Sequence, residues 1–228
     1  MNNVYTTIIV PAKDEEDGLP IVLQKVCGIV DDTYEVIVID DGSVDGTTEV
    51  ASRFQCQVIK HEVNRGKGAA LQTGIAMARG ENILWIDADD TYPASLIPQM
   101  VEAMETYDMV VCSRKYGRHN IPRFNRIGLW LFRTLIQGIY GFQAFDPCTG
   151  LYGVKKYHLE RMNLLSSRFA IEPEISMKGG RMKLKTLDMP IEYRDRVGET
   201  KLNSIVVGFE DLMRILSLCF WRPDRTSC

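Results

Sequence analysis

Short apolar runs alternate with segments of helical periodicity through the first half of the chain. The runs are too brief for helices and rich in β-branched residues, as buried strands are, and they span residues 6–10, 34–39, 57–60, 82–87 and 109–112. The segments with apolar positions at helical spacing lie between them, at 17–30, 43–54, 66–79 and 94–106. Gly80 stands where a C′ residue that ends a helix is expected. This alternation predicts a mostly parallel sheet covered by helices on both faces.

The second half of the chain does not continue this alternation. From Val111 to Phe142 there are six basic residues and no acidic one. Within this segment residues 128–136 are apolar and bulky, and a second amphipathic stretch runs from Ile205 to Trp221. Such helices either pack against a protein core or lie in the interface of a membrane, and the pattern alone leaves both readings open.

Acidic residues follow three of the predicted strands. The acids stand in three short segments, Pro11-Ala12-Lys13-Asp14-Glu15-Glu16, Asp40-Asp41-Gly42-Ser43 and Asp87-Ala88-Asp89-Asp90. Any one of them is compatible with a solvated turn or an acidic helix cap. Because the carboxyl ends of parallel strands meet at the edge where open α/β folds bind ligands, three together predict a binding site. Carboxylates this close repel one another unless a hard divalent cation joins them, and such a cation also binds phosphate oxygens.

Composition narrows the classes of function. The net charge of −3 argues against a nucleic-acid partner, which would need a basic excess. The six cysteines are scattered without metal-binding or redox spacing, which indicates free thiols in a reducing cytosol. The polar first residues lead directly into a strand, and no run of about 18 uncharged apolar residues is present. We therefore expect a cytoplasmic protein without a signal peptide or a membrane span.

Taken together, these motifs resemble the family 2 inverting glycosyltransferases of the GT-A fold. The segments that carry the resemblance are Pro11-Ala12-Lys13-Asp14-Glu15, residues 38–47, Asn64-Arg65-Gly66-Lys67-Gly68-Ala69-Ala70 and Asp87-Ala88-Asp89. Three later segments are similar to the dolichyl- or polyprenyl-phosphate sugar synthases, a branch that includes dolichol-phosphate mannosyltransferase: Ser113-Arg114, Asp146-Pro147-Cys148-Thr149-Gly150 and residues 196–203. The resemblance follows the family's order over essentially the whole chain.

The resemblance implies an α/β fold of the GT-A type, a single Rossmann-like domain with a mostly parallel central sheet and C-terminal amphipathic helices. One catalytic domain would span residues 1–228. Residues 1–112 would form its nucleotide-sugar-binding half, residues 113–203 its acceptor-binding half, and residues 204–228 an amphipathic C-terminal helix.

The resemblance also implies a role for individual residues of the donor site. Those that would bind the nucleotide sugar are Pro11, Ala12, Glu15, Asp40, Asp41, Lys67, Asp87, Ala88 and Asp89, with Asp40 or Asp41 bonding the base. Asp87 and Asp89 would hold Mg²⁺ or Mn²⁺ against the donor diphosphate. Close relatives often have Gln two positions after the second Asp; here Thr91, a weaker ligand, would leave part of the metal's shell to water.

The reaction implied is the transfer of one hexose, with inversion, from a donor such as GDP-mannose or UDP-glucose to polyprenyl or dolichyl phosphate. A phosphate monoester is already largely ionised at neutral pH, so this acceptor needs cations and no protein base. Together with Asp89, the catalytic residues would be Arg114, Arg126, Arg196 and Lys201, with Arg123 as an alternative to Arg126. Lys115 and Arg118 are better explained as members of surface ion pairs.

Several alternatives stay open. Transfer to a glycan or small-molecule hydroxyl would require a base, for which Asp146, Glu172 and Glu174 are candidates. A sugar nucleotidyltransferase is disfavoured because no glycine-rich loop follows the first strand, and polymer synthesis because the Gln-x-x-Arg-Trp motif is absent. From a different class, an inactive scaffold that binds nucleotide is the remaining reading.

The end of the sequence bears on the membrane. Many relatives continue past the amphipathic helix into transmembrane helices, whereas this sequence ends at Cys228. We therefore expect a peripheral protein on the cytoplasmic face of a membrane, or one that works with a separate membrane protein.

Overall fold

The computed structural model describes residues 4–117, 123–198 and 204–222. The first half alternates as predicted, with β1 (Thr6–Ala12), α1 (Leu19–Cys27), β2 (Tyr34–Asp40), α2 (Thr47–Ala51), β3 (Gln57–Lys60), α3 (Lys67–Met77) and β4 (Asn82–Ile86). A 3₁₀ turn η1 (Ala94–Leu96), α4 (Ile97–Ala103) and β5 (Met109–Tyr116) follow. The second half consists of α5 (Arg123–Tyr140), β6 (Leu151–Lys155), α6 (Lys156–Met162), α7 (Ile171–Arg181), β7 (Thr186–Glu192) and α8 (Ser204–Ser217). The amphipathic helices α5 and α8 were expected, whereas β6, α6, α7 and β7 were not.

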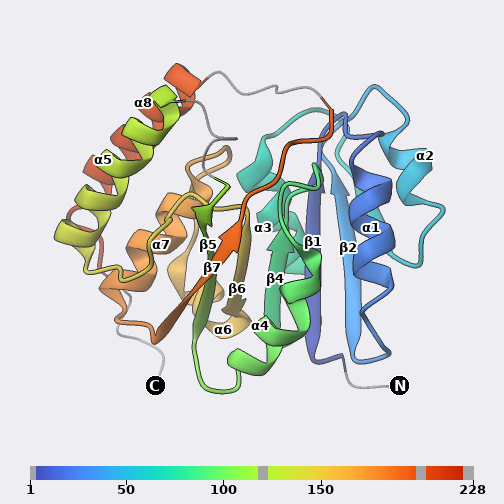
Figure 1. Ribbon diagram of the computed structural model, residues 1–228, viewed down its shortest axis with the longest axis horizontal. Helices are drawn as coiled ribbons and strands as arrows, with labels where there is room; N and C mark the ends of the chain where they lie inside the picture. Colours follow the sequence, from blue (N-terminus) through green and yellow to red (C-terminus); the bar gives the residue numbers. More distant parts are fainter. Residues whose placement is uncertain (1–3, 118–122, 199–203, 223–228) are drawn as a thin grey trace.

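All of these strands belong to one seven-stranded sheet in the order β3-β2-β1-β4-β6-β5-β7 (Figure 1). Neighbouring strands are parallel except where β6 pairs with β4 and with β5. The expected mostly parallel sheet is therefore confirmed, with one antiparallel strand, β6, inserted between β4 and β5. Trp85 of β4 lies opposite Tyr152 of β6 in the register, and their rings stack with centroids 5.0 Å apart.

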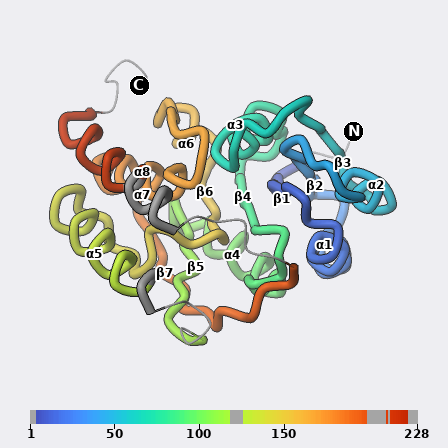
Figure 2. Tube along the Cα trace, turned by 90° about the horizontal axis from the view of Figure 1, so that it is seen from above, coloured from blue at the N-terminus to red at the C-terminus, as the bar shows by residue number. Residues whose placement is uncertain are grey.

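Helices cover both faces of the sheet, because each central strand is apolar on both sides. In β1, Ile9 packs into a core with α3, α5, α6, α7 and α8. Its neighbours Ile8 and Val10 face the other way, into a core with α1, α2 and α4. This separation of alternate residues follows the two-residue period of a strand. Figure 2 looks onto the sheet end-on and shows the helices on its two sides.

The helices α5, α7 and α8 pack together beside the β5–β7 end of the sheet (Figures 1 and 2). Their inner side chains are buried, and the Tyr140 hydroxyl donates a hydrogen bond to the Ile215 carbonyl. Other apolar side chains of α5 and of the turn that follows α8 stay in solvent, among them Trp130 at 62% and Phe220 at 93% exposed. Within the described residues, no helix has the length and hydropathy that crossing a bilayer requires.

The end of α3 differs from the sequence-based expectation. The helix ends at Met77, and Ala78 is already extended with ψ of 137°. Gly80 is not a left-handed C′ residue; its backbone lies against β1, where an added Cβ would be 2.6 Å from the Thr7 nitrogen. The glycine is required by this close approach, which lets the chain enter β4 directly beside β1.

Candidate active site

The three acidic segments meet at one edge of the sheet. Strand β1 lies between β2 and β4 and runs parallel to both, so their carboxyl ends are adjacent. Ala12 at the end of β1 pairs in register with Asp40 at the end of β2. The loops after β1 and β2 and the segment after β4 therefore lie side by side, as the positions of the acids after apolar runs predicted.

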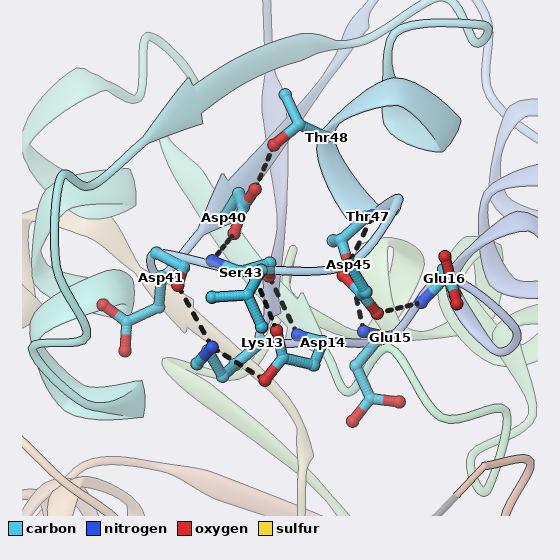
Figure 3. A network of polar contacts seen from close by, with 12 residues as sticks. Lys13, Asp14, Glu15, Glu16, Asp40, Asp41, Ser43, Asp45, Thr47 and Thr48 are labelled. Carbon is cyan, nitrogen blue, oxygen red and sulfur yellow. Dashed lines mark hydrogen bonds and ion pairs between the residues drawn. The ribbon is translucent and has the colours of Figure 1, made fainter.

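The loops after β1 and β2 hold each other in place (Figure 3). Fully buried Asp40 accepts hydrogen bonds from the Ser43 nitrogen at 2.7 Å and from the Thr48 hydroxyl. Asp14 accepts a bond from the Val44 nitrogen at 2.8 Å, and its own nitrogen donates to the Ser43 hydroxyl. Figure 3 shows the carboxylates of Asp41 and Glu15 pointing away from this network.

Asp41 fixes the start of α3. Its carboxylate accepts bonds from the backbone nitrogens of Arg65, at 2.9 Å, and Gly66, at 2.7 Å. It also lies 2.7 Å from Nδ1 of buried His61, whose Nε2 is 3.0 Å from the Thr73 hydroxyl. Asp40 and Asp41 therefore bond within the protein, and a bond from either one to a nucleotide base stays a prediction.

Lys67, the first residue of α3, bridges two carboxylates. Its Nζ lies 2.6 Å from Oδ1 of Asp87 and 2.5 Å from Oε1 of Glu172, at the start of α7. Burial raises the pKa of Asp87, and the nearby Asp89 adds to this effect. Burial also raises the pKa of Glu172. Burial alone would lower the pKa of Lys67, but the two carboxylates raise it above its ordinary value.

Asp89 is bound from two sides. Its carboxylate accepts a bond from the Thr91 hydroxyl at 2.6 Å and pairs with Arg196 at 2.7 Å. The same guanidinium also pairs with Glu15, so Arg196 links the loop after β1 to the segment after β4. The third acid of this segment, Asp90, is instead bonded at 2.6 Å to Lys25 of α1.

Arg114, near the end of β5, is held by a two-point contact with Asp146. Its Nε donates to Oδ2 at 2.5 Å and its Nη2 to Oδ1 at 3.0 Å. Although burial opposes ionisation of the carboxyl, the guanidinium holds the pKa of Asp146 below its usual range. Asp146 also accepts a bond from the Cys148 nitrogen at 3.2 Å, so it caps the turn that follows.

The donor atoms at this edge fit Mg²⁺ or Mn²⁺. Asp87 and Asp89 offer carboxylate oxygens and Thr91 a hydroxyl, the hard ligands that these ions prefer. In the ion pairs of Lys67 and Arg196, four carboxylates face two side-chain cations. Two negative charges therefore remain, and one divalent ion would balance them. The parts of the chain that the structure describes contain no group of three or more acids, histidines or cysteines already arranged around a metal position.

The other predicted site residues are distributed as follows. Pro11, Ala12 and Ala88 are buried at the strand ends. Arg126 lies partly exposed on α5, and Lys201 falls outside the described residues. The expected surface ion pair of Lys115 is present, with Asp188 at 2.8 Å, whereas Arg118 lies outside the described residues.

Two partners in this site were not assigned there from the sequence. His61 has no motif around it, and its contact with Asp41 depends on the fold. Glu172 was named only as a candidate base, and its link to Lys67 joins segments that are far apart in the chain.

Comparison of the sequence with known protein families identifies the family of this chain. The model of Glycosyl transferase family 2 matches residues 7–162. The chain belongs to this family. This glycosyltransferase is 29% identical to the dolichyl-phosphate hexose transferase of Haloferax volcanii, over 93% of this chain and 92% of the relative. It is 26% identical to the dolichol-phosphate mannosyltransferase of Pyrococcus furiosus, over 96% of this chain and 64% of the relative.

The fold of this glycosyltransferase is also found in solved structures. Glucosyl-3-phosphoglycerate synthase from Mycobacterium tuberculosis, crystallised with Mn²⁺, UDP and glucosyl-3-phosphoglycerate, superposes with a TM-score of 0.74 at 21% identity. The match covers 97% of this chain and 81% of that one. The expected GT-A fold and the resemblance to family 2 are both confirmed.

Proposed function

We propose that this family 2 glycosyltransferase moves a hexose from a nucleotide sugar to a polyprenyl or dolichyl phosphate, with inversion at the anomeric carbon. The observation that carries the proposal is the meeting of two ion pairs at one sheet edge, Asp87 with Lys67 and Asp89 with Arg196. Arg114 contacts the carbonyl of Cys148 in the adjacent turn. The relatives named for dolichyl phosphate match over nearly the whole chain, which supports the choice of acceptor.

Asp87 and Asp89 would hold Mg²⁺ or Mn²⁺, with Thr91 beside them. The ion, when bound, would neutralise the charge that develops on the leaving diphosphate. Pro11, Ala12 and Ala88 would form the wall against which the nucleotide lies. Glu15 would lie at the ribose, since its carboxylate points out of the loop network (Figure 3), where it pairs with Arg196.

Catalysis would proceed without a protein base, because a phosphate acceptor is already ionised at neutral pH. Arg196 and Lys201, with Arg126 or Arg123, would offset repulsion between the anionic acceptor and the anionic donor. Arg114 would contact the sugar-phosphate end of the donor, from the rigid position that Asp146 gives it. Positioning and electrostatic stabilisation would then supply most of the rate acceleration.

The rival reading is transfer to a hydroxyl, which requires a base. All three candidates pair with a cation: Asp146 with Arg114, fully buried Glu174 with Lys178 at 2.5 Å, and Glu172 with Lys67 at 2.5 Å. Glu172 is the candidate that lies next to Asp87, through Lys67. A hydroxyl acceptor therefore depends chiefly on Glu172.

The lipid acceptor requires access to a membrane, and the outer surface of α5 and α8 is suited to it. Large apolar side chains of these two helices are exposed, namely Ile127, Trp130, Leu131, Ile139, Met213 and Leu216, and so is Phe220, which follows α8. The two helices lie side by side (Figure 1) and their inner faces pack on the core. We propose that this surface binds the cytoplasmic face of a membrane, alone or with a separate membrane protein.

Donor binding tests the first half of the proposal. We expect Mn²⁺ together with one nucleotide sugar, GDP-mannose or UDP-glucose in the first instance, to raise the melting temperature, because a ligand stabilises the state that binds it. The same mixture with a short prenyl phosphate should yield a hexosyl lipid whose anomeric configuration is opposite to that of the donor. Stabilisation without lipid product, but with transfer to a hydroxyl compound, would favour the rival reading.

A further inference from the structure

Helix α7 begins with two acidic residues that have different surroundings. Glu172 and Glu174 are both buried, at 3% and 0% exposed. Glu174 binds Lys178 and accepts bonds from the backbone nitrogens of residues 165 and 166, so it holds its own part of the fold together. Glu172 contacts Lys67, whose ammonium also contacts Asp87. One of the two acids thus belongs to the scaffold and the other to the donor site.

The side chain of Lys67 is confined between α3 and α7. Its helix starts against the segment before α7, where the Ala69 nitrogen donates to the Ser167 carbonyl at 2.9 Å. At Gly68 there is no space for a side chain, since an added Cβ would be 2.2 Å from the Ser166 carbonyl oxygen. Only 13% of the Lys67 side chain is exposed, so the ammonium is held near both carboxylates rather than turned to solvent.

Asp87 is confined as well. Its Oδ1 contacts Lys67, while its Oδ2 packs against Gly150, where an added Cβ would be only 2.0 Å away. A cation that approaches Asp87 therefore meets a carboxylate that already has a positive partner. How strongly that partner competes depends on whether another anion shares it.

We propose that Glu172 is a positioning residue for metal binding: it shares the Lys67 ammonium with Asp87 and thereby keeps Asp87 available to the divalent ion. This inference rests on the proposed function, since it takes Asp87 as a metal ligand. When the ion binds Asp87, Lys67 keeps one anionic partner in Glu172. Without that partner, Lys67 pairs with Asp87 alone, and the ion must displace it at a cost in affinity.

The experiment measures Mn²⁺ binding to the full chain by the loss of the free-ion EPR signal, with no donor or acceptor present. Glu172→Gln removes the charge that retains Lys67, and we expect it to weaken Mn²⁺ binding about 10- to 100-fold, the range for residues that orient metal ligands. Lys67→Met combined with Glu172→Gln removes the competitor too and should bring affinity back close to that of the unaltered protein. Glu172→Asp keeps the anion and should have a smaller effect than Glu172→Gln.

Glu160→Gln makes the same chemical change on α6, where the side chain is 60% exposed, and serves as the matched control. Unchanged Mn²⁺ binding in Glu172→Gln would overturn the inference alone. Weak binding in the double variant as well would also overturn it, because Glu172 would then be a direct ligand. Absence of Mn²⁺ binding by the unaltered protein would overturn the proposed metal site itself. If Glu172→Gln does not fold, the double variant and Glu172→Asp decide the matter, both being required to bind Mn²⁺.

Discussion

Substitution of Glu174 by Gln tests whether this acid is structural, as its surroundings indicate. Every group near its carboxylate is a donor or a cation: the Lys178 ammonium at 2.5 Å, the backbone nitrogens of Leu165 and Ser166 at 3.0 and 2.7 Å, and Arg214 at 3.9 Å. A Gln side chain replaces one acceptor oxygen by an NH₂ group. In either orientation that group opposes another donor, and Lys178 loses its buried counter-charge.

The size of the effect follows from burial. Both side chains of the Glu174–Lys178 pair are 0% exposed, so solvent does not screen the loss. Breaking a buried pair by removing one charge costs about 3–5 kcal/mol in the free energy of unfolding. For a chain of this length, about 2–4 °C per kcal/mol applies, so Glu174→Gln should melt about 6–20 °C lower.

Differential scanning fluorimetry measures this shift, with Glu160→Gln as the exposed control, which should melt within about 2 °C of the unaltered protein. Transfer assayed well below the lowered melting temperature should persist, because Glu174 takes no part in the reaction. A melting temperature equal to that of the unaltered protein would refute the electrostatic argument. Normal stability together with lost transfer would instead make Glu174 the base and favour a hydroxyl acceptor.

Four further predictions concern the site, the surface and pH. Asp89→Asn should stay folded, because the Asn oxygen can still accept the hydrogen bond from the Thr91 hydroxyl, but it should lose turnover. EDTA should abolish the turnover of the unaltered protein reversibly. Full activity of the variant, or of the protein in EDTA, would exclude the metal site. Lys201→Ala should reduce transfer severely while donor-induced stabilisation persists, so equal loss of both would remove its assignment to the acceptor. Trp130→Ser should reduce flotation with anionic vesicles that contain prenyl phosphate, and flotation should weaken with salt; an unaltered protein that never floats would refute membrane binding. Burial opposes ionisation of Glu174, but its contacts, chiefly the one with Lys178, hold its pKa below the usual value. The ionised carboxylate therefore stabilises the fold fully above about pH 4, and this stabilisation is lost as the pH falls through the lower pKa of the folded state. Between pH 7 and pH 3 the melting temperature should thus fall less steeply for Glu174→Gln than for the unaltered protein.

The parts of the fold that could be predicted from sequence are those with a local signal. Strands β1, β2 and β4 are continuous apolar runs, and their positions put the acids at one edge. Strand β6 has no such signal, since it is short and includes Gly153, and it forms because β4 and β5 pair with it on both sides. Strand β7 includes Pro190, which is tolerated because the strand lies at the edge of the sheet.

The candidate site was predictable to the same extent. Asp87, Asp89 and Arg114 could be found because motifs surround them. Lys67 and Arg196 were named as well, but the pairing of Lys67 with Glu172 and of Asp89 with Arg196 could not be predicted, because these contacts join segments distant in the chain. For helices α5 and α8, packing on the core is observed on one side. Exposed apolar side chains remain on another side, and binding of that side to a membrane stays a prediction.

The most direct test of the account compares two acceptors that differ only in the phosphate. The unaltered protein would be incubated with Mn²⁺, a labelled nucleotide sugar that stabilises it, and either a prenyl phosphate or the prenol of the same chain length. We expect labelled lipid from the phosphate and none from the alcohol, because the proposed mechanism uses cations for an ionised acceptor and no base for a hydroxyl. Transfer to the prenol at a comparable rate, or to neither lipid while a soluble hydroxyl compound is labelled, would contradict it.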